Sequence, residues 1–105
     1  MEKKILSLFQ GRHPMPDEVT GAVLKFVKDP TDLKDITEQV HYSLKDCNEL
    51  ILYTTGLSVA LVAVINYCEF NRIPLTVMHH DKVSNTYFPQ EIYIPDPENN
   101  KNYGG

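Results

Sequence analysis

Long hydrophobic runs, clusters of basic residues and tryptophan are all missing from this chain of 105 residues, whose net charge is −4. The longest apolar stretch, Leu57 to Tyr67, is far shorter than the ~20 residues that a membrane-spanning helix needs, so we expect no membrane contact. Without a run of lysines or arginines, the chain offers little to the phosphates of a nucleic-acid duplex. The expected partner is therefore a small ligand or another protein.

Cysteine is also scarce: there are two, Cys47 and Cys68, and their separation is not a metal-binding spacing. With no pattern of a secretory signal at the N-terminus, two such residues predict reduced thiols in a cytoplasmic protein. Cys68, in an apolar helix, is interpreted as a core residue rather than a catalytic thiol, because no histidine is patterned beside it. We expect no metal and no other cofactor.

The length allows one domain with a modest core. The apolar pattern predicts an α/β fold, a single Rossmann-like domain over residues 1–94 with a mainly parallel four-stranded sheet flanked by helices, plus a C-terminal edge strand. Residues 95–105 are polar and of low complexity, which predicts a disordered tail. The expected strands are 4–9, 50–54, 75–78 and an extended segment 86–94, and the expected helices are 32–46 and 57–70.

Residues 19–28 fit either a helical face or a strand stopped by Asp29-Pro30, and the strand is favoured. The following helix is capped by Thr31 or Asp32. Its apolar residues recur at spacings of three and four, which places them on one face: Leu33, Ile36, Val40 and Leu44.

The most informative segment is a strand, turn and helix unit around Gly56. The apolar run Leu50–Tyr53 stops at Thr54-Thr55-Gly56-Leu57-Ser58, and an apolar helix follows at once. Glycine allows close backbone approach, while the first amides of a helix lack partners within it and lie at the positive end of its dipole. Such a turn binds anions, above all phosphates. The alternative is structural: Ser58 or Thr55 only caps the helix, and Gly56 only makes the turn.

In an open parallel sheet, ligands bind at the carboxyl ends of the strands. Three loops are expected to meet there: Gly11-Arg12-His13-Pro14, the turn Thr54–Ser58, and His79-His80-Asp81. Together they offer helix-terminal amides, hydroxyls, a guanidinium and imidazoles, which are the groups that a phosphodiester or a nucleotide phosphate needs. We therefore expect the ligand site at this edge.

Each of these side chains also has a plainer explanation. An arginine such as Arg12 in a surface loop is often merely solvated. His79 and His80 leave a strand on opposite faces, which argues against zinc and leaves one of them to line the crevice. Tyr87 and Phe88 either stack on a base or belong to the core or an interface.

The order of these motifs resembles a known family: a strand followed by His13-Pro14, the turn Thr54–Ser58 with its Ala- and Val-rich helix, then His79-His80-Asp81 and Tyr87–Ile92. Over residues 4–94 the chain is similar to the small stand-alone proteins of type III CRISPR loci. These are single-domain relatives of the CRISPR-associated Rossmann-fold (CARF) sensor domains, and several are ring nucleases. The resemblance implies a role in antiviral defence, in a homodimer that binds a cyclic oligoadenylate across its two-fold axis and often linearises it without metal.

In family terms, Gly56 and Ser58 match the ligand-binding turn, and Arg12 and His13 match the loop after the first strand. The implied chemistry is phosphodiester cleavage by the ligand's own ribose 2′-hydroxyl. The implied catalytic residues are Arg12, which stabilises charge, and His13 or His80, which protonates the leaving oxygen. The implied ligand-binding residues are Gly11, Thr54, Thr55, Gly56, Leu57, Ser58, His79 and Asp81.

Two other functions stay open: a binder that captures a cyclic or mononucleotide ligand without cutting it, and a structural interaction module whose edge strand, Tyr87–Ile94, joins a partner's sheet. A domain this small buries a limited share of its surface. A C2 homodimer is therefore expected whether the protein cleaves its ligand or only binds it. Its interface is expected to cover the Tyr87-Phe88 pair and the apolar residues Leu57, Leu61, Val64 and Ile65.

Overall fold

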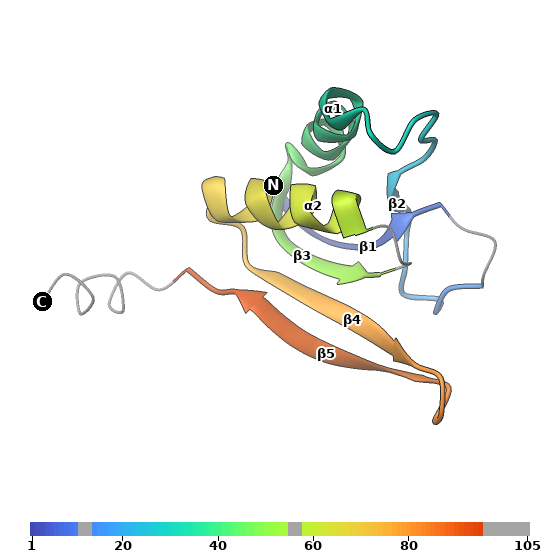
Figure 1. The fold of residues 1–105 in the computed structure, drawn as a ribbon. Coiled ribbons are helices and arrows are strands. Elements are labelled where there is room, and N and C mark those ends of the chain that lie inside the picture. The colour runs from blue at the N-terminus through green and yellow to red at the C-terminus, as the bar shows by residue number, and fades with distance from the viewer. Residues whose placement is uncertain (11–13, 55–57, 96–105) are drawn as a thin grey trace, which may run out of the picture.

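The computed structural model describes residues 1–10, 14–54 and 58–95, which form one α/β unit with a five-stranded sheet and two helices (Figure 1). The strands are β1 (Glu2–Phe9), β2 (Ala22–Leu24), β3 (Cys47–Tyr53), β4 (Leu75–Asp81) and β5 (Thr86–Tyr93), and the helices are α1 (Leu33–Leu44) and α2 (Ser58–Phe70). Neither of these helices has the length and apolar character that crossing a membrane requires. The tail expected to be disordered lies almost wholly outside the described residues.

The sheet has the strand order β2-β1-β3-β4-β5, in which the first four strands are parallel and β5 is antiparallel to β4. The mainly parallel sheet and the C-terminal edge strand expected from the sequence are thus confirmed. Side chains that share a row across the strands share a face. Leu6, Leu52 and Val77 form one such row, and Ser7, Tyr53 and Met78 form the next.

Both helices lie on one face of the sheet (Figure 1). The connections from β2 to β3 and from β3 to β4 run in the same direction across the sheet, so two crossovers of the same hand place α1 and α2 on the same side. The helices contact each other there, with the rings of His41 and Tyr67 5.8 Å apart. Under them lie fully buried strand residues, among them Leu8, Leu50, Leu52, Leu75 and Val77.

Helix α1 begins as the sequence predicts, with Asp32 as its N-cap: the carboxylate accepts a hydrogen bond of 3.1 Å from the Asp35 amide. Its face toward the sheet consists of Ile36, Val40 and Leu44, whereas Leu33, expected on that face, is 60 % exposed. Helix α2 ends at Phe70, and Arg72, two residues further on, has a positive φ of 55°. There the Ile73 amide bonds back to the Cys68 carbonyl, and the buried Ile73 side chain joins the core.

Some expected strand bounds and part of the expected interface differ from the structure. Residues 19–28 do contain a strand, but it covers only Ala22–Leu24. Strand β4 runs beyond 78 to Asp81, so the expected loop His79-His80-Asp81 was wrong; these residues stay in the strand because they pair with β5. The expected interface residues were also wrong in part: Val64 is fully buried within the chain, and Leu61 and Ile65 pack against its core.

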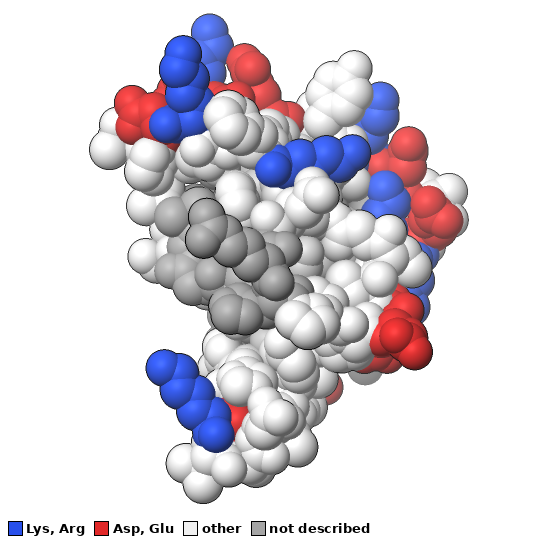
Figure 2. All heavy atoms as spheres, turned by 90° about the vertical axis from the view of Figure 1, so that its right-hand side faces the viewer, with Lys and Arg blue, Asp and Glu red and all other residues white. Residues whose placement is uncertain are grey.

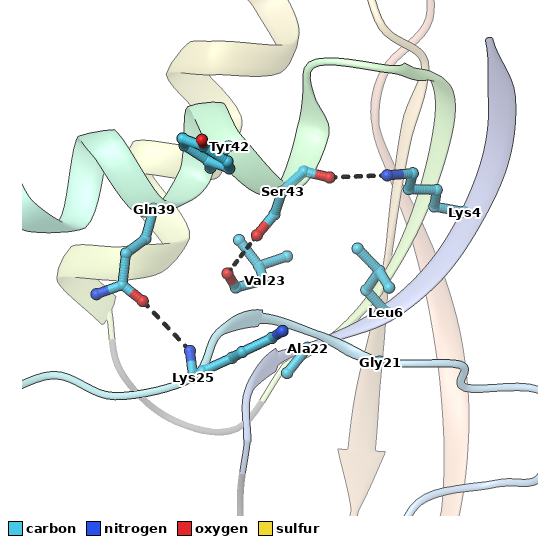
Figure 3. Close-up of a pocket in the computed structure, with 9 residues that line it drawn as sticks. All are labelled: Lys4, Leu6, Gly21, Ala22, Val23, Lys25, Gln39, Tyr42 and Ser43. Atoms are coloured by element: carbon cyan, nitrogen blue, oxygen red, sulfur yellow. Dashed lines mark hydrogen bonds between the residues drawn. The ribbon is translucent and has the colours of Figure 1, made fainter.

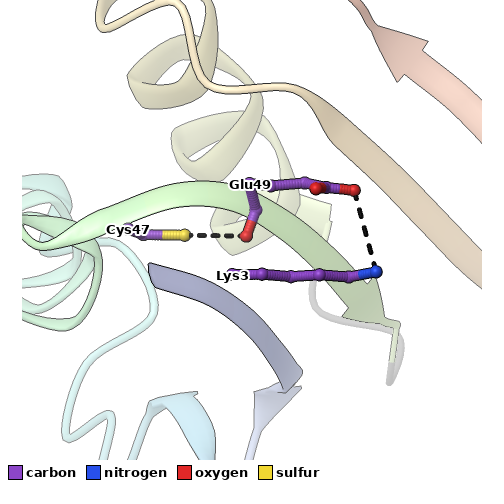
Figure 4. A network of polar contacts seen from close by, with 3 residues as sticks. All are labelled: Lys3, Cys47 and Glu49. Carbon is purple, nitrogen blue, oxygen red and sulfur yellow. Dashed lines mark hydrogen bonds and ion pairs between the residues drawn. The ribbon is translucent and has the colours of Figure 1, made fainter. Parts of the chain in front are cut away.

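Cys68 is buried in the core, as expected, and Cys47 is buried there too. Burial raises the pKa of the Cys68 thiol to about 12, and it also raises that of Cys47. The Cys47 thiol bonds to the Glu49 carbonyl near the start of β3, where the Glu49 side chain pairs with Lys3 of β1 (Figure 4). Thiols held protonated in this way are poor nucleophiles, which supports the structural interpretation.

The edge strand β2 is fastened to α1 by side chains of the helix. Ser43 Oγ donates to the Val23 carbonyl at 2.6 Å. Gln39 makes two bonds to the backbone that follows β2: its Oε1 accepts from the Lys25 amide at 3.3 Å, and its Nε2 donates to the Phe26 carbonyl at 2.8 Å. These are backbone groups that a further strand would otherwise bind, since β2 pairs only with β1.

We predict that Gln39→Ala lowers the free energy of unfolding by about 1–2 kcal/mol, because two backbone groups of the edge segment lose their partners. Urea denaturation measures this loss, and amide hydrogen exchange at Lys25 should quicken. The matched control is Glu38→Ala, which removes an exposed neighbour on the same helix and should change stability by less than about 0.5 kcal/mol. Equal stability of the two variants would contradict the fastening role.

Candidate functional site

The candidate site lies at the carboxyl ends of β1 and β3, which are neighbours at the centre of the sheet. Their connections leave in opposite directions, β1 toward β2 and β3 toward β4. Such a switch in direction leaves a crevice outside the strand ends, where ligands of open α/β sheets bind. Both segments that the sequence singled out follow these two strands. Six predicted site residues lie outside the described part of the chain: Gly11, Arg12, His13, Thr55, Gly56 and Leu57.

Figure 2 looks onto this side of the molecule. Around the residues drawn in grey, the visible surface is largely uncharged, and the Lys, Arg, Asp and Glu side chains gather at its periphery. Among the described residues, charged side chains are therefore not concentrated at the strand ends. An anion approaching this edge meets no dense patch of carboxylates among the described residues.

Thr54 and Ser58 flank the predicted phosphate-binding turn. Ser58 is exposed and is the first residue of α2, so the positive end of the helix dipole lies at this edge, as predicted. Thr54 is tied to β4 instead: its amide and its Oγ1 both donate to the Met78 carbonyl, at 3.2 and 3.3 Å. The Thr54 hydroxyl can accept a further hydrogen bond, but its proton is already engaged.

His79 and His80 point to opposite faces of β4, as predicted. His79 Nε2–H donates to Gln90 Oε1 at 2.8 Å, and its ring lies 5.4 Å from that of Phe88. His80 Nε2–H donates to Asn85 Oδ1 at 3.0 Å. β3 ends opposite Met78 of β4. Both histidines therefore lie on the part of the β4–β5 hairpin that extends beyond the end of β3.

Asp81 has a structural role in the β4–β5 turn. Its Oδ1 accepts from the Val83 amide at 3.1 Å and its Oδ2 from Ser84 Oγ at 2.8 Å. The bond from Ser84, followed by that from Val83, lowers the pKa of Asp81. The carboxylate is thus occupied within its own turn, which weakens the expectation that it binds a ligand.

No pattern in the sequence indicates the contact that anchors the segment before β2. Tyr53, 3 % exposed on the sheet face away from the helices, donates its hydroxyl hydrogen bond to the Glu18 carboxylate. Burial, followed by this bond, raises the pKa of Tyr53 to about 12. The contact joins the end of β3 to the segment that follows Arg12 and His13. A buried tyrosine needs a polar partner, but spacing does not reveal which one.

Tyr87 extends the same anchor. Its ring packs edge-on against Tyr53, with centroids 4.8 Å apart, and lies 5.2 Å from the ring of His80. Its hydroxyl contacts the Met15 sulfur at 3.9 Å. Tyr87 is therefore a half-buried packing residue on this face, whereas Phe88, on the other face, is half exposed.

In the described residues, no three His, Cys, Asp or Glu side chains gather closely enough to hold a metal ion. The polar groups that the described residues bring to this edge are the hydroxyls of Thr54 and Ser58, the imidazoles of His79 and His80, and the amide that opens α2. Hydroxyls and amides bind anions, and an imidazole moves protons near neutral pH.

Comparison of the chain with family models, with curated proteins and with solved structures found no match. The resemblance to CARF-like proteins therefore stays a prediction. The geometry of the strand ends is the basis on which a function can be argued.

We predict that the free energy of unfolding falls as the pH rises from about 10 to about 12. Unfolded Tyr53 loses its proton near the ordinary tyrosine pKa of 10.0, whereas the folded protein holds it to about 12, so the folded state binds more protons in this window. Tyr53→Phe should lose part of this decline, as measured by urea denaturation across the pH series. Tyr42→Phe, which alters an exposed ring, should decline like the wild type. Identical declines for both variants would contradict the anchor at Tyr53.

Proposed function

We propose that this chain binds a cyclic oligoadenylate across a homodimer and linearises it by metal-independent phosphodiester cleavage. The observation that carries the proposal is the direction switch between β1 and β3, with α2 starting at the carboxyl end of β3. A Rossmann-like sheet uses this crevice for nucleotides, and a helix N-terminus there favours phosphate. The uncharged described surface at this edge is compatible with a polyanionic ligand.

The reaction proposed is attack of a ribose 2′-hydroxyl on the adjacent phosphorus. The new O2′–P bond replaces the P–O5′ bond and the 2′-hydroxyl releases its proton to water, so the products are a 2′,3′-cyclic phosphate and a 5′-hydroxyl. The protein must hold the ring in line and stabilise the charge on the phosphoryl oxygens. We assign the second role to Arg12 and to the amides that open α2, and binding to the segment Thr54–Ser58.

A proton must reach the leaving O5′, and we assign this to His13 or His80. The Nε2–H of His80 is engaged with Asn85, so Nδ1 is the ring nitrogen left to deliver a proton. The imidazole is exposed and stands beyond the end of β3, two residues past the pairing of Tyr53 with Met78. His79 is assigned to ligand binding on the other face of the hairpin.

The alternative, a binder that captures the ligand without cutting it, has one observation in its favour. His79 and His80 both donate to amide oxygens rather than to carboxylates. A carboxylate partner would raise the basicity of the ring and stabilise its charged form, as in catalytic dyads. If neither His80 nor His13 protonates the leaving O5′, we expect the protein to bind the ligand without cleaving it.

We predict that the protein cleaves cyclic tri-, tetra- or hexa-adenylate in excess chelator, with products separated by chromatography. Arg12→Ala should slow cleavage by about 10²-fold, the loss typical of one charge-stabilising group. The matched control is the other arginine, Arg72→Ala, which lies after the far end of α2 and should cleave at the wild-type rate. Activity lost in chelator and restored by manganese or zinc would overturn the mechanism. Binding without products would favour the alternative.

The proposed dimer rests on the outer face of α2, which the fold leaves uncovered. Val59, Val62 and Phe70 are 37, 55 and 88 % exposed. Glu69 is the single charged residue between Ser58 and Phe70. A helix that is apolar all round is normally buried, and an uncharged face is complementary to a second copy of itself. We propose that the two α2 helices run parallel about the two-fold axis, because only this arrangement brings both first turns, and with them both proposed phosphate-binding turns, to one shared ligand.

We predict that Val62→Asp converts a dimer to a monomer at micromolar concentration, measured by light scattering. It should also abolish oligoadenylate binding, because a single turn remains for each ligand. Val83→Asp adds the same charge at the tip of the hairpin, where the side chain is 96 % exposed, and should stay dimeric. A wild-type monomer, or a dimer that survives Val62→Asp, would rule out this interface.

A further inference from the structure

A second hollow lies away from the strand ends, between α1 and the β1–β2 side of the sheet (Figure 3). Its volume is about 440 Å³, within the range of sites that hold small organic ligands. The side chains and backbone that line it come from three elements or the residues next to them: Lys4, Leu6, Gly21, Ala22, Val23, Lys25, Gln39, Tyr42 and Ser43.

Two ammonium groups face this hollow and no carboxylate lines it. Lys4, half-buried on β1, donates one hydrogen bond to the Ser43 carbonyl at 3.0 Å, which leaves two of its three donors. Lys25 follows β2, and its side chain extends along the floor of the hollow (Figure 3). The ion pair found in the described residues joins Lys3 to Glu49, so neither Lys4 nor Lys25 has an acidic partner among them. Two unneutralised cations at one concavity attract an anion.

The other polar groups of the lining are already engaged. Gln39 and Ser43 hold the backbone of the edge segment, as described above, and the Asp35 carboxylate accepts from Gln39 Nε2 at 3.1 Å rather than reaching either lysine. The recognition chemistry left to the hollow is therefore two ammonium groups and the ring of Tyr42. That ring is 74 % exposed at the rim, with Lys45 Nζ 4.7 Å from its centroid.

We propose that this hollow binds a nucleoside monophosphate, with the phosphate between Lys4 and Lys25 and the base stacked on Tyr42. Two lysines are suited to a dianionic phosphate, and an exposed aromatic ring is a stacking platform for any base. The volume exceeds what a phosphate ion alone would fill, which argues for the attached nucleoside. The proposal does not rest on the proposed ring cleavage, because none of the residues that line the hollow is assigned to the strand-end site. Lys4 is near the start of β1, whereas Lys25 lies level with the end of β1, since Leu24 pairs with Phe9.

The test is a titration of the full chain with adenosine 5′-monophosphate, followed by calorimetry and by amide chemical shifts. Shifts are expected at Val23, Lys25 and Ser43. Shifts confined to Thr54, Ser58 and His79 would place the nucleotide in the strand-end crevice and overturn the second site. Lys4→Met and Lys25→Met, which keep most of the aliphatic stem, should each weaken binding at least about tenfold, the loss of one charge-assisted contact.

Lys3→Met is the matched control, because Lys3 is adjacent on β1 and does not line the hollow. It should bind the nucleotide as the wild type does. Tyr42→Ala should weaken the monophosphate about tenfold and leave binding of inorganic phosphate unchanged. Equal binding of inorganic phosphate and the nucleotide would overturn the nucleotide assignment. Undiminished binding in the Lys4→Met, Lys25→Met double variant would overturn the site itself.

Discussion

The burial of β3 at the centre of the sheet is the constraint on which the rest of the structure depends. Leu50 and Leu52 are fully buried, and their register aligns Leu6 on one side and Leu75 and Val77 on the other. A row of this kind fixes the register, since a slip of one residue would turn every side chain to the opposite face. The same row is the floor on which both helices pack. Because β3 is paired on both sides as far as Tyr53, the position of its carboxyl end in the sheet is determined by this register.

The two faces of the sheet have different tasks. Under the helices the side chains are aliphatic and serve packing. On the other face, Tyr53, Tyr87 and His80 form a line of rings, and Tyr53 holds Glu18. This second arrangement attaches the segment after β1 to the end of β3, so that two connections which leave the sheet in opposite directions stay near each other. A binding crevice needs such attachment, because loops alone have little to hold them.

The fold was largely predictable because its signals are local. Continuous apolar runs mark the central strands, Asp32 marks the start of α1, and Pro89 marks an edge strand, and the structure has each of these. The misplaced parts depend on partners distant in sequence. Residues 79–81 read as a loop, but pairing with β5 keeps them in a strand.

The candidate site was predictable only in its location. The order of the elements along the chain predicts which strand ends are neighbours in the sheet. It does not predict which residue a given side chain contacts. Tyr53 required an acceptor that no periodicity assigns to Glu18. Asp81 was grouped with the histidines by adjacency, although its oxygens serve the turn. Residues that are adjacent at the end of one strand can thus have unrelated structural roles.

The fastening of β2 by Gln39 and Ser43 has a consequence for how copies of the chain meet. A sheet that is open at both edges can add copies without limit and grow into fibres. Here α1 seals one edge, so β5 is the edge at which the described sheet can be extended. A copy that joins through β5 uses up the open edge of both molecules. Unlike a sheet with two open edges, such a pair would present no third strand edge for further addition.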